Sequence, residues 1–202
     1  NGTIERCTIQ NNTGGGNGGG GINMAGGVVK GCILDGNNCA GTAKGGGIVL
    51  TGGIVSNCVI RNGTTGVRSG GGGVYMTAGQ VVGCTITNNK YVGWDCYEGA
   101  GIWMSGGMVR NTLIAGNVIY DYNTWGAGVH MEGGQLLSCT IVSNSCIGSH
   151  QVGGDGLGMV GGGIHYEAGG ITNCIIYGNT TERVGDDDNL DGTGVTNASW
   201  YS

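Results

Sequence analysis

The chain has 202 residues, of which 50 are Gly and none is Pro or Phe, and its formal net charge is −5. Gly lies far above its usual share of roughly 7%, but a chain without Pro cannot form a collagen-like triple helix. Hydrophobic residues make up 39% of the chain, which argues against disorder, and only 10% of residues are charged. We therefore expect no basic surface for nucleic acid, and no apolar run approaches the ~18 residues of a membrane-spanning helix.

One pattern recurs from end to end, and its clearest copy runs from Gly71 to Asn89. Abbreviated, it reads G-G-G-I-x-M-x-G-G-x-V-x-x-C-x-I-x-x-N. Copies aligned on the Cys position are separated by 25, 26, 26, 28, 27 and 35 residues, and a period in this range indicates a repeat architecture. The aligned position is occupied by Cys7, Cys32, Cys58, Cys84, Thr112, Cys139 and Cys174.

Each copy contains short segments in which apolar and variable residues alternate, and many of the apolar residues are β-branched. This pattern predicts β-strands, and short strands joined by Gly and Asn corners must pair with their equivalents in the next copy. The predicted fold is all-β: a right-handed parallel β-helix of about seven coils of roughly 26 residues, with three short strands per coil. We expect the β-helix to span residues 1–179, and residues 180–202 to form an acidic tail with a possible last strand at Val195–Tyr201.

The Asn that closes most copies is expected to adopt left-handed backbone geometry and to hydrogen-bond from coil to coil through its side-chain amide. Cys residues of the aligned column are expected to be buried thiols rather than disulfides, because stacked side chains that point the same way fit disulfide geometry poorly. Three further Cys are assigned to loops, and among these Cys96–Cys146 is the first choice for a disulfide. The total of nine Cys leaves at least one thiol unpaired.

Two short motifs connect the chain to a known group. The sequence G-[GA]-G-[IV] begins at Gly19, Gly45, Gly71, Gly99, Gly126 and Gly161, and [IL]-x-x-N closes six of the seven coils. In these motifs the chain resembles the chlamydial polymorphic outer-membrane proteins and other bacterial β-helix surface proteins of the autotransporter-passenger type, with Ile or Leu where the chlamydial motif has Phe. The resemblance implies a secreted or surface-displayed adhesive or structural protein, and it carries over no catalytic residue.

The first residue, Asn1, already lies within a repeat, so we expect a processed piece of a longer precursor. No capping segment is evident at either end, and an uncapped solenoid presents strand edges that invite pairing with another chain. We therefore predict an extracellular filament or stalk subunit that stacks end to end with copies of itself, rather than an enzyme. The alternative is a module that binds or cleaves polysaccharide.

Aromatic residues are concentrated where the predicted loops are longest, at Lys90–Glu98, Val118–Trp125 and Ser145–Val160. Such loops commonly form the binding face of a solenoid. The candidates for contact with a glycan or a protein partner are Tyr75, Trp94, Tyr97, Trp103, Tyr122, Trp125, His130 and His165.

Two His and two Glu residues share equivalent positions in neighbouring coils. His130 and Glu132 should lie one coil from His165 and Glu167, so the four side chains should form a compact square on one outward face. Imidazole and carboxylate groups in this arrangement could bind a divalent metal or take part in acid–base chemistry. The alternative is an exposed polar face on which His and Glu only pair with each other.

The acidic tail suggests a second metal site. Asp187-x-Asn189-x-Asp191-Gly192 matches the first half of a calcium-binding loop, although Ala198 stands where the bidentate acid is expected. The candidate calcium ligands are Asp186, Asp187, Asp188, Asn189 and Asp191. The alternative is a solvated acidic linker.

Overall fold

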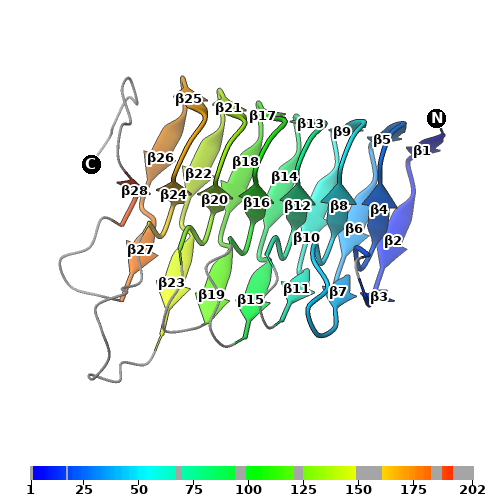
Figure 1. The fold of residues 1–202 in the computed structure, drawn as a ribbon, viewed down its shortest axis with the longest axis horizontal. Helices are drawn as coiled ribbons and strands as arrows, with labels where there is room; N and C mark the ends of the chain where they lie inside the picture. The colour runs from blue at the N-terminus through cyan, green and yellow to red at the C-terminus, as the bar shows by residue number, and fades with distance from the viewer. Residues whose placement is uncertain are drawn as a thin grey trace.

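The structure is a computed structural model, and it describes residues 2–16, 18–66, 70–93, 99–120, 125–148, 161–182 and 188–192. These residues form 28 short β-strands and no helix, and thus no helix long enough to cross a membrane. The strands build four parallel sheets of seven strands each, which run along one rod (Figure 1). We name them sheets A to D, in the order in which the chain enters them within one coil.

Sheets A and B contain strands of three residues. Sheet A consists of β1 (Thr3–Glu5), β5 (Val28–Lys30), β9 (Ile54–Ser56), β13 (Gln80–Val82), β17 (Met108–Arg110), β21 (Gln135–Leu137) and β25 (Gly170–Thr172). Sheet B consists of β2 (Thr8–Gln10), β6 (Ile33–Asp35), β10 (Val59–Arg61), β14 (Thr85–Thr87), β18 (Leu113–Ala115), β22 (Thr140–Val142) and β26 (Ile175–Tyr177).

Sheets C and D complete each coil. Sheet C consists of β3 (Thr13–Gly14), β7 (Asn38–Cys39), β11 (Thr64–Thr65), β15 (Lys90–Val92), β19 (Val118–Tyr120), β23 (Ser145–Ile147) and β27 (Thr180–Thr181). Sheet D consists of β4 (Ile22–Met24), β8 (Ile48–Leu50), β12 (Val74–Met76), β16 (Ile102–Met104), β20 (Val129–Met131), β24 (Ile164–Tyr166) and β28 (Leu190–Gly192).

The predicted architecture is confirmed, but its details need two corrections. Each coil has four strands rather than three, because the starts of the predicted loops form sheet C. The inward positions of sheet C vary from Thr65 to Tyr91 to Ile119, so no repeated residue marks these strands in the sequence. Seven strands per sheet are separated by six intervals, so the chain makes about six complete turns rather than seven.

The coils are held in register, so that equivalent residues lie directly above one another. Val81, for example, pairs with Val55 on one side and Val109 on the other, and all three are fully buried. The corners between sheets D and A require Gly. At Gly107, φ is +81° and an added Cβ would lie 2.7 Å from the carbonyl oxygen of Gly79 in the preceding coil.

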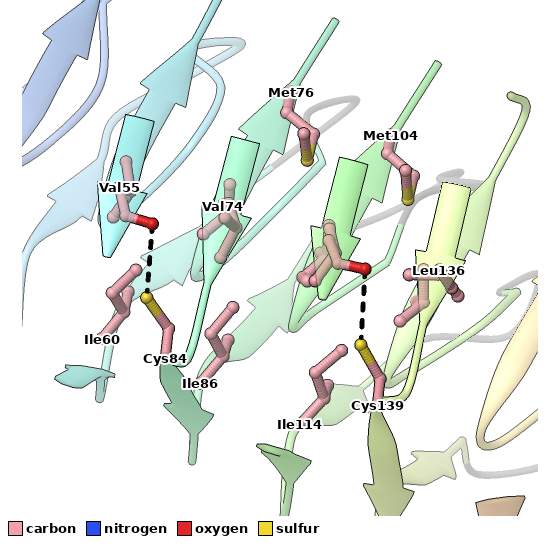
Figure 2. Packing of buried hydrophobic residues seen from close by; sticks show 14 of the residues in the cluster. Val55, Ile60, Val74, Met76, Cys84, Ile86, Met104, Ile114, Leu136 and Cys139 are labelled. Atoms are coloured by element: carbon pink, nitrogen blue, oxygen red, sulfur yellow. Dashed lines mark hydrogen bonds between the residues drawn. The ribbon is translucent and has the colours of Figure 1, made fainter. Parts of the chain in front are cut away.

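The main core fills the space enclosed by sheets A, B and D (Figure 2). Its column of Cys residues is buried beyond the first coil, as predicted, and the seven Cys outside the predicted disulfide pair are free thiols. The thiols also form hydrogen bonds. Sγ of Cys84 donates to the carbonyl oxygen of Val55 at 3.7 Å, and Sγ of Cys58 accepts the backbone N–H of Cys32 at 3.4 Å. Thr112 can replace Cys at one position of this column because its Oγ1 accepts the backbone N–H of Cys84 at 3.3 Å.

A second column, of Asn side chains, forms the predicted coil-to-coil hydrogen bonds. Asn117 is fully buried, and its Oδ1 accepts the backbone N–H and the side-chain Nδ2–H of Asn89, both at 3.0 Å. Its Nδ2 donates to Oδ1 of Asn144 at 2.9 Å. The expected left-handed backbone falls one residue earlier, for example at Asn88 with φ of 55°. One residue of each corner therefore adopts the left-handed backbone, and the next residue provides the amide of the ladder.

The last described strands fall within the segment predicted to be a tail. β27 pairs with β23 and β28 pairs with β24, so sheets C and D continue beyond residue 179. The predicted last strand at 195–201 lies outside the described residues.

Candidate functional site

One outward-facing column of sheet D gathers the candidate site residues. The strand register places Tyr75, Trp103, His130, His165 and Asp191 on five successive strands. The sequence suggested an exposed face, but the side chains are largely covered: Tyr75 is 9%, Trp103 6% and His130 1% exposed. The column therefore forms a second packed layer outside the main core.

The first half of this layer is aromatic. The rings of Tyr75 and Trp103 stack in parallel, with centroids 4.2 Å apart and planes 3° from each other. Nζ of Lys44 donates to the Tyr75 hydroxyl at 2.8 Å and lies 4.4 Å from the centroid of that ring, in cation–π range. The repeat pattern gave no sign of Lys44, because this residue lies outside the motif. Burial and this packing leave neither ring as an open face for stacking on a sugar.

The second half of the layer contains the His/Glu cluster, which we define as His130, Glu132, His165, Glu167 and Asp191. Glu167 is central to it: its Oε1 lies 3.4 Å from Nε2 of His130 and 3.6 Å from Nε2 of His165. Oε1 of Glu132 lies 3.8 Å from Nε2 of His130. The predicted square of four side chains is therefore present as a geometric arrangement.

Asp191 belongs to this cluster, although the sequence assigned it to the predicted calcium site. Its Oδ2 lies 3.0 Å from Nδ1 of His165, a hydrogen-bond distance. When His165 is neutral and donates Nδ1–H to Asp191, its Nε2 carries the lone pair and faces Glu167. The Trp125 ring stacks on the same imidazole, with centroids 4.7 Å apart. Asp191 and Trp125 together set the orientation of His165.

The cluster is buried at its imidazoles and open at its carboxylates. The side chains of His130 and His165 are 2% and 12% exposed, against 40% and 47% for Glu132 and Glu167. Partial burial raises the pKa of the Glu132 carboxyl, and the negative charge of Glu167 raises it further, while the Trp103 indole opposes the shift. Among the described residues, the one group of three side chains placed to hold a metal ion is His130, His165 and Glu167, whose ligand atoms lie within 4.8 Å of one another.

The described part of the predicted calcium segment does not gather its oxygen atoms. Oδ1 of Asp188 accepts the backbone N–H of Thr181 at 2.7 Å, and Oδ1 of Asn189 extends the Asn ladder by accepting Nδ2–H of Asn179 at 3.1 Å. These two oxygens therefore serve the solenoid. Asp186 and Asp187 lie outside the described residues.

Several other candidates also lie outside the described residues: Trp94, Cys96, Tyr97 and Tyr122. The proposed partner of Cys96 is described. Cys146 lies in β23 rather than in a loop, is 1% exposed and packs in a small cluster with Tyr91 and Ile119. The disulfide itself stays a prediction.

Comparison with known proteins is consistent with the architecture. A model of the right-handed β-helix region matches residues 1–181. No curated protein and no solved structure matches the chain. The family match covers most of the chain, and the four stacked parallel sheets fit it. The chain belongs to the right-handed β-helix family.

Proposed function

We propose that the chain is a structural or adhesive β-solenoid, located outside the cell or on its surface, that serves as a filament or stalk subunit and stacks end to end. The location is supported by the resemblance to bacterial surface-displayed β-helix proteins. Stiffness along the rod is supported by the four in-register sheets and by the buried amide ladder. Each ladder repeats the same hydrogen bonds, so bending the rod would strain many bonds together.

The observation that carries this proposal is the repetition of one coil, whose equivalent residues stack in register, as Val55, Val81 and Val109 do. Each coil pairs with the next through parallel strands in all four sheets. A coil of this kind can also pair with a coil of another chain that offers the same register and the same inward residues. A second copy of the chain offers such a coil, and repeated head-to-tail contacts produce a filament.

Sedimentation velocity and electron microscopy of the chain test this proposal. We expect concentration-dependent rods that lengthen along the solenoid axis. Ile9→Lys should abolish them, because Ile9 is an inward residue of the first coil and a charge there would be buried at the contact. Thr8→Lys is the matched control, because Thr8 is the exposed outward neighbour in the same strand. Monomers alone at every concentration would contradict end-to-end stacking.

Polysaccharide binding receives less support. Tyr75 and Trp103 are the aromatic candidates in the same outward column of sheet D as His130 and His165, and both are nearly buried. A sugar could reach them only if the covering segments moved. We therefore prefer the structural role, and glycan-array binding that is lost in Trp103→Ala would reverse this preference.

A further inference from the structure

We propose that the His/Glu cluster is a binding site for a divalent transition metal of the zinc class, with His130, His165 and Glu167 as ligands and Asp191 as the residue that orients His165. This inference does not depend on the proposed filament. It rests on the geometry of one outward column of sheet D and on the chemistry of its donor atoms.

The spacing of the ligand atoms fits such an ion. Zinc binds His nitrogen and carboxylate oxygen at about 2.0–2.2 Å in tetrahedral geometry, so its ligand atoms lie about 3.4 Å from one another. The two contacts of the Glu167 oxygen, 3.4 Å to His130 and 3.6 Å to His165, are close to this value. The widest separation in the group is at most 4.8 Å, and modest side-chain rotation would close it.

The surroundings of His165 match those of a metal-binding imidazole. Such imidazoles usually give their second N–H to a carboxylate, which sets the tautomer and makes the free nitrogen more basic. Asp191 provides this contact at Nδ1, and Nε2 points to Glu167. Trp125 packs on the ring and restricts its rotation. Both imidazoles are buried, with side chains 2% and 12% exposed.

The charge balance also favours a cation. Three carboxylates surround the two imidazoles: Glu132 and Glu167 lie beside His130, and Glu167 and Asp191 lie beside His165. Lys44 acts on Glu132 as a nearby cation. A divalent ion would offset the remaining negative charge. The exposure of the Glu132 and Glu167 carboxylates gives the ion access from solvent.

The geometry also explains why two metal predictions made from the sequence merge into one. The sequence placed Asp191 in a calcium segment and the four His and Glu residues in a separate square. In the structure β28 pairs with β24, so that Asp191 stacks on His165. The nitrogen donors favour a transition metal over calcium, which prefers ligand sets made of oxygen.

Zinc titration of the full chain by calorimetry, with a non-thiol reductant, tests the proposal. We expect one equivalent of zinc to bind, and Glu167→Gln to weaken the affinity at least tenfold. Asp191→Asn should weaken it 10- to 100-fold, as is typical for a residue that supports a ligand. Glu5→Gln is the control: Glu5 has a similarly exposed side chain, at 38%, but lies in the first strand and pairs with Lys30. Far-UV circular dichroism of the metal-free variants checks that they are folded.

X-ray absorption spectroscopy at the zinc edge distinguishes this site from the Cys thiols. Nitrogen and oxygen ligands at about 2.0–2.2 Å would support the proposal, and sulfur at about 2.3 Å would overturn it. The absence of zinc binding would show that the cluster only forms ion pairs. An affinity unchanged in both Glu167→Gln and Asp191→Asn would equally refute the assignment.

Discussion

The buried Asn ladder offers a direct test of what holds the coils together, through the substitution Asn117→Ala. The side-chain oxygen of Asn117 accepts two hydrogen bonds from Asn89, and its amide nitrogen donates to the carbonyl oxygen of Ile86 at 3.1 Å and to Asn144 at 2.9 Å. Removing the amide leaves two donors of Asn89 without this acceptor, at a point of the column where Asn89, Asn117 and Asn144 are fully buried. A buried polar group without a partner costs about 1–3 kcal/mol. We expect a loss of about 3–5 kcal/mol in the free energy of unfolding.

Asn12→Ala is the matched control, because Asn12 is the exposed first member of the same column. It loses one side-chain bond, from Nδ2 to Oδ1 of Asn37 at 2.9 Å, and that oxygen still accepts the backbone N–H of residue 12 at 3.1 Å. Its cost should stay below about 1 kcal/mol. Urea unfolding followed by circular dichroism measures both variants. If Asn117→Ala and Asn12→Ala lose equal stability, burial of the amide hydrogen bonds is not what makes the ladder stabilising.

Three further predictions concern other parts of the rod. Thr112→Val should cost about 1–2 kcal/mol in the same urea assay, because it removes the hydroxyl that accepts the N–H of Cys84 and donates to the carbonyl oxygen of Arg110; no loss would show that this bond contributes nothing. Trp103→Ala should cost about 3–5 kcal/mol because the ring is buried against Tyr75, whereas a cost near zero would mean that the ring is exposed in solution. Asp35→Asn should remove a pH-dependent part of the stability: hydrogen bonds from Asn62 and Arg61 lower the pKa of Asp35, so its contribution is present above its ordinary pKa of 3.8 and is lost as the pH falls through the lowered value. The melting temperatures of the unchanged chain and of Asp35→Asn should converge as the pH falls through the pKa of Asp35. A difference that stays constant with pH would contradict a stabilising role for the Asp35 carboxylate.

Much of the architecture could be predicted because the fold repeats one short pattern. An inward residue of a stacked coil packs against the equivalent residue of the next coil. The same residue types therefore recur at the same spacing in the sequence. Cys84 and Ile86 could therefore be assigned to buried columns, and Asn89 to a column that hydrogen-bonds from coil to coil, from their spacing alone. Sheet C escaped detection for the opposite reason, since Thr65, Tyr91 and Ile119 stack there without sharing a residue type. Each strand of sheet C lies along the chain between a strand of sheet B and a strand of sheet D, and both of those strands carry repeated residues.

The His/Glu cluster divides in the same way between what the sequence determined and what the tertiary structure decided. Equal spacing from the repeat placed His130 beside His165 and Glu132 beside Glu167, because residues in equivalent positions must stack. The burial of Trp103 and the arrival of Lys44 and Asp191 could not be read from the repeat. Lys44 comes from a segment outside the motif that brings its Nζ over the Trp103 ring, and Asp191 comes from β28, which joins sheet D without carrying the motif. The periodic part of the chain thus sets which side chains are neighbours, while only the packing of its irregular segments determines which of these are covered and what chemistry they can perform.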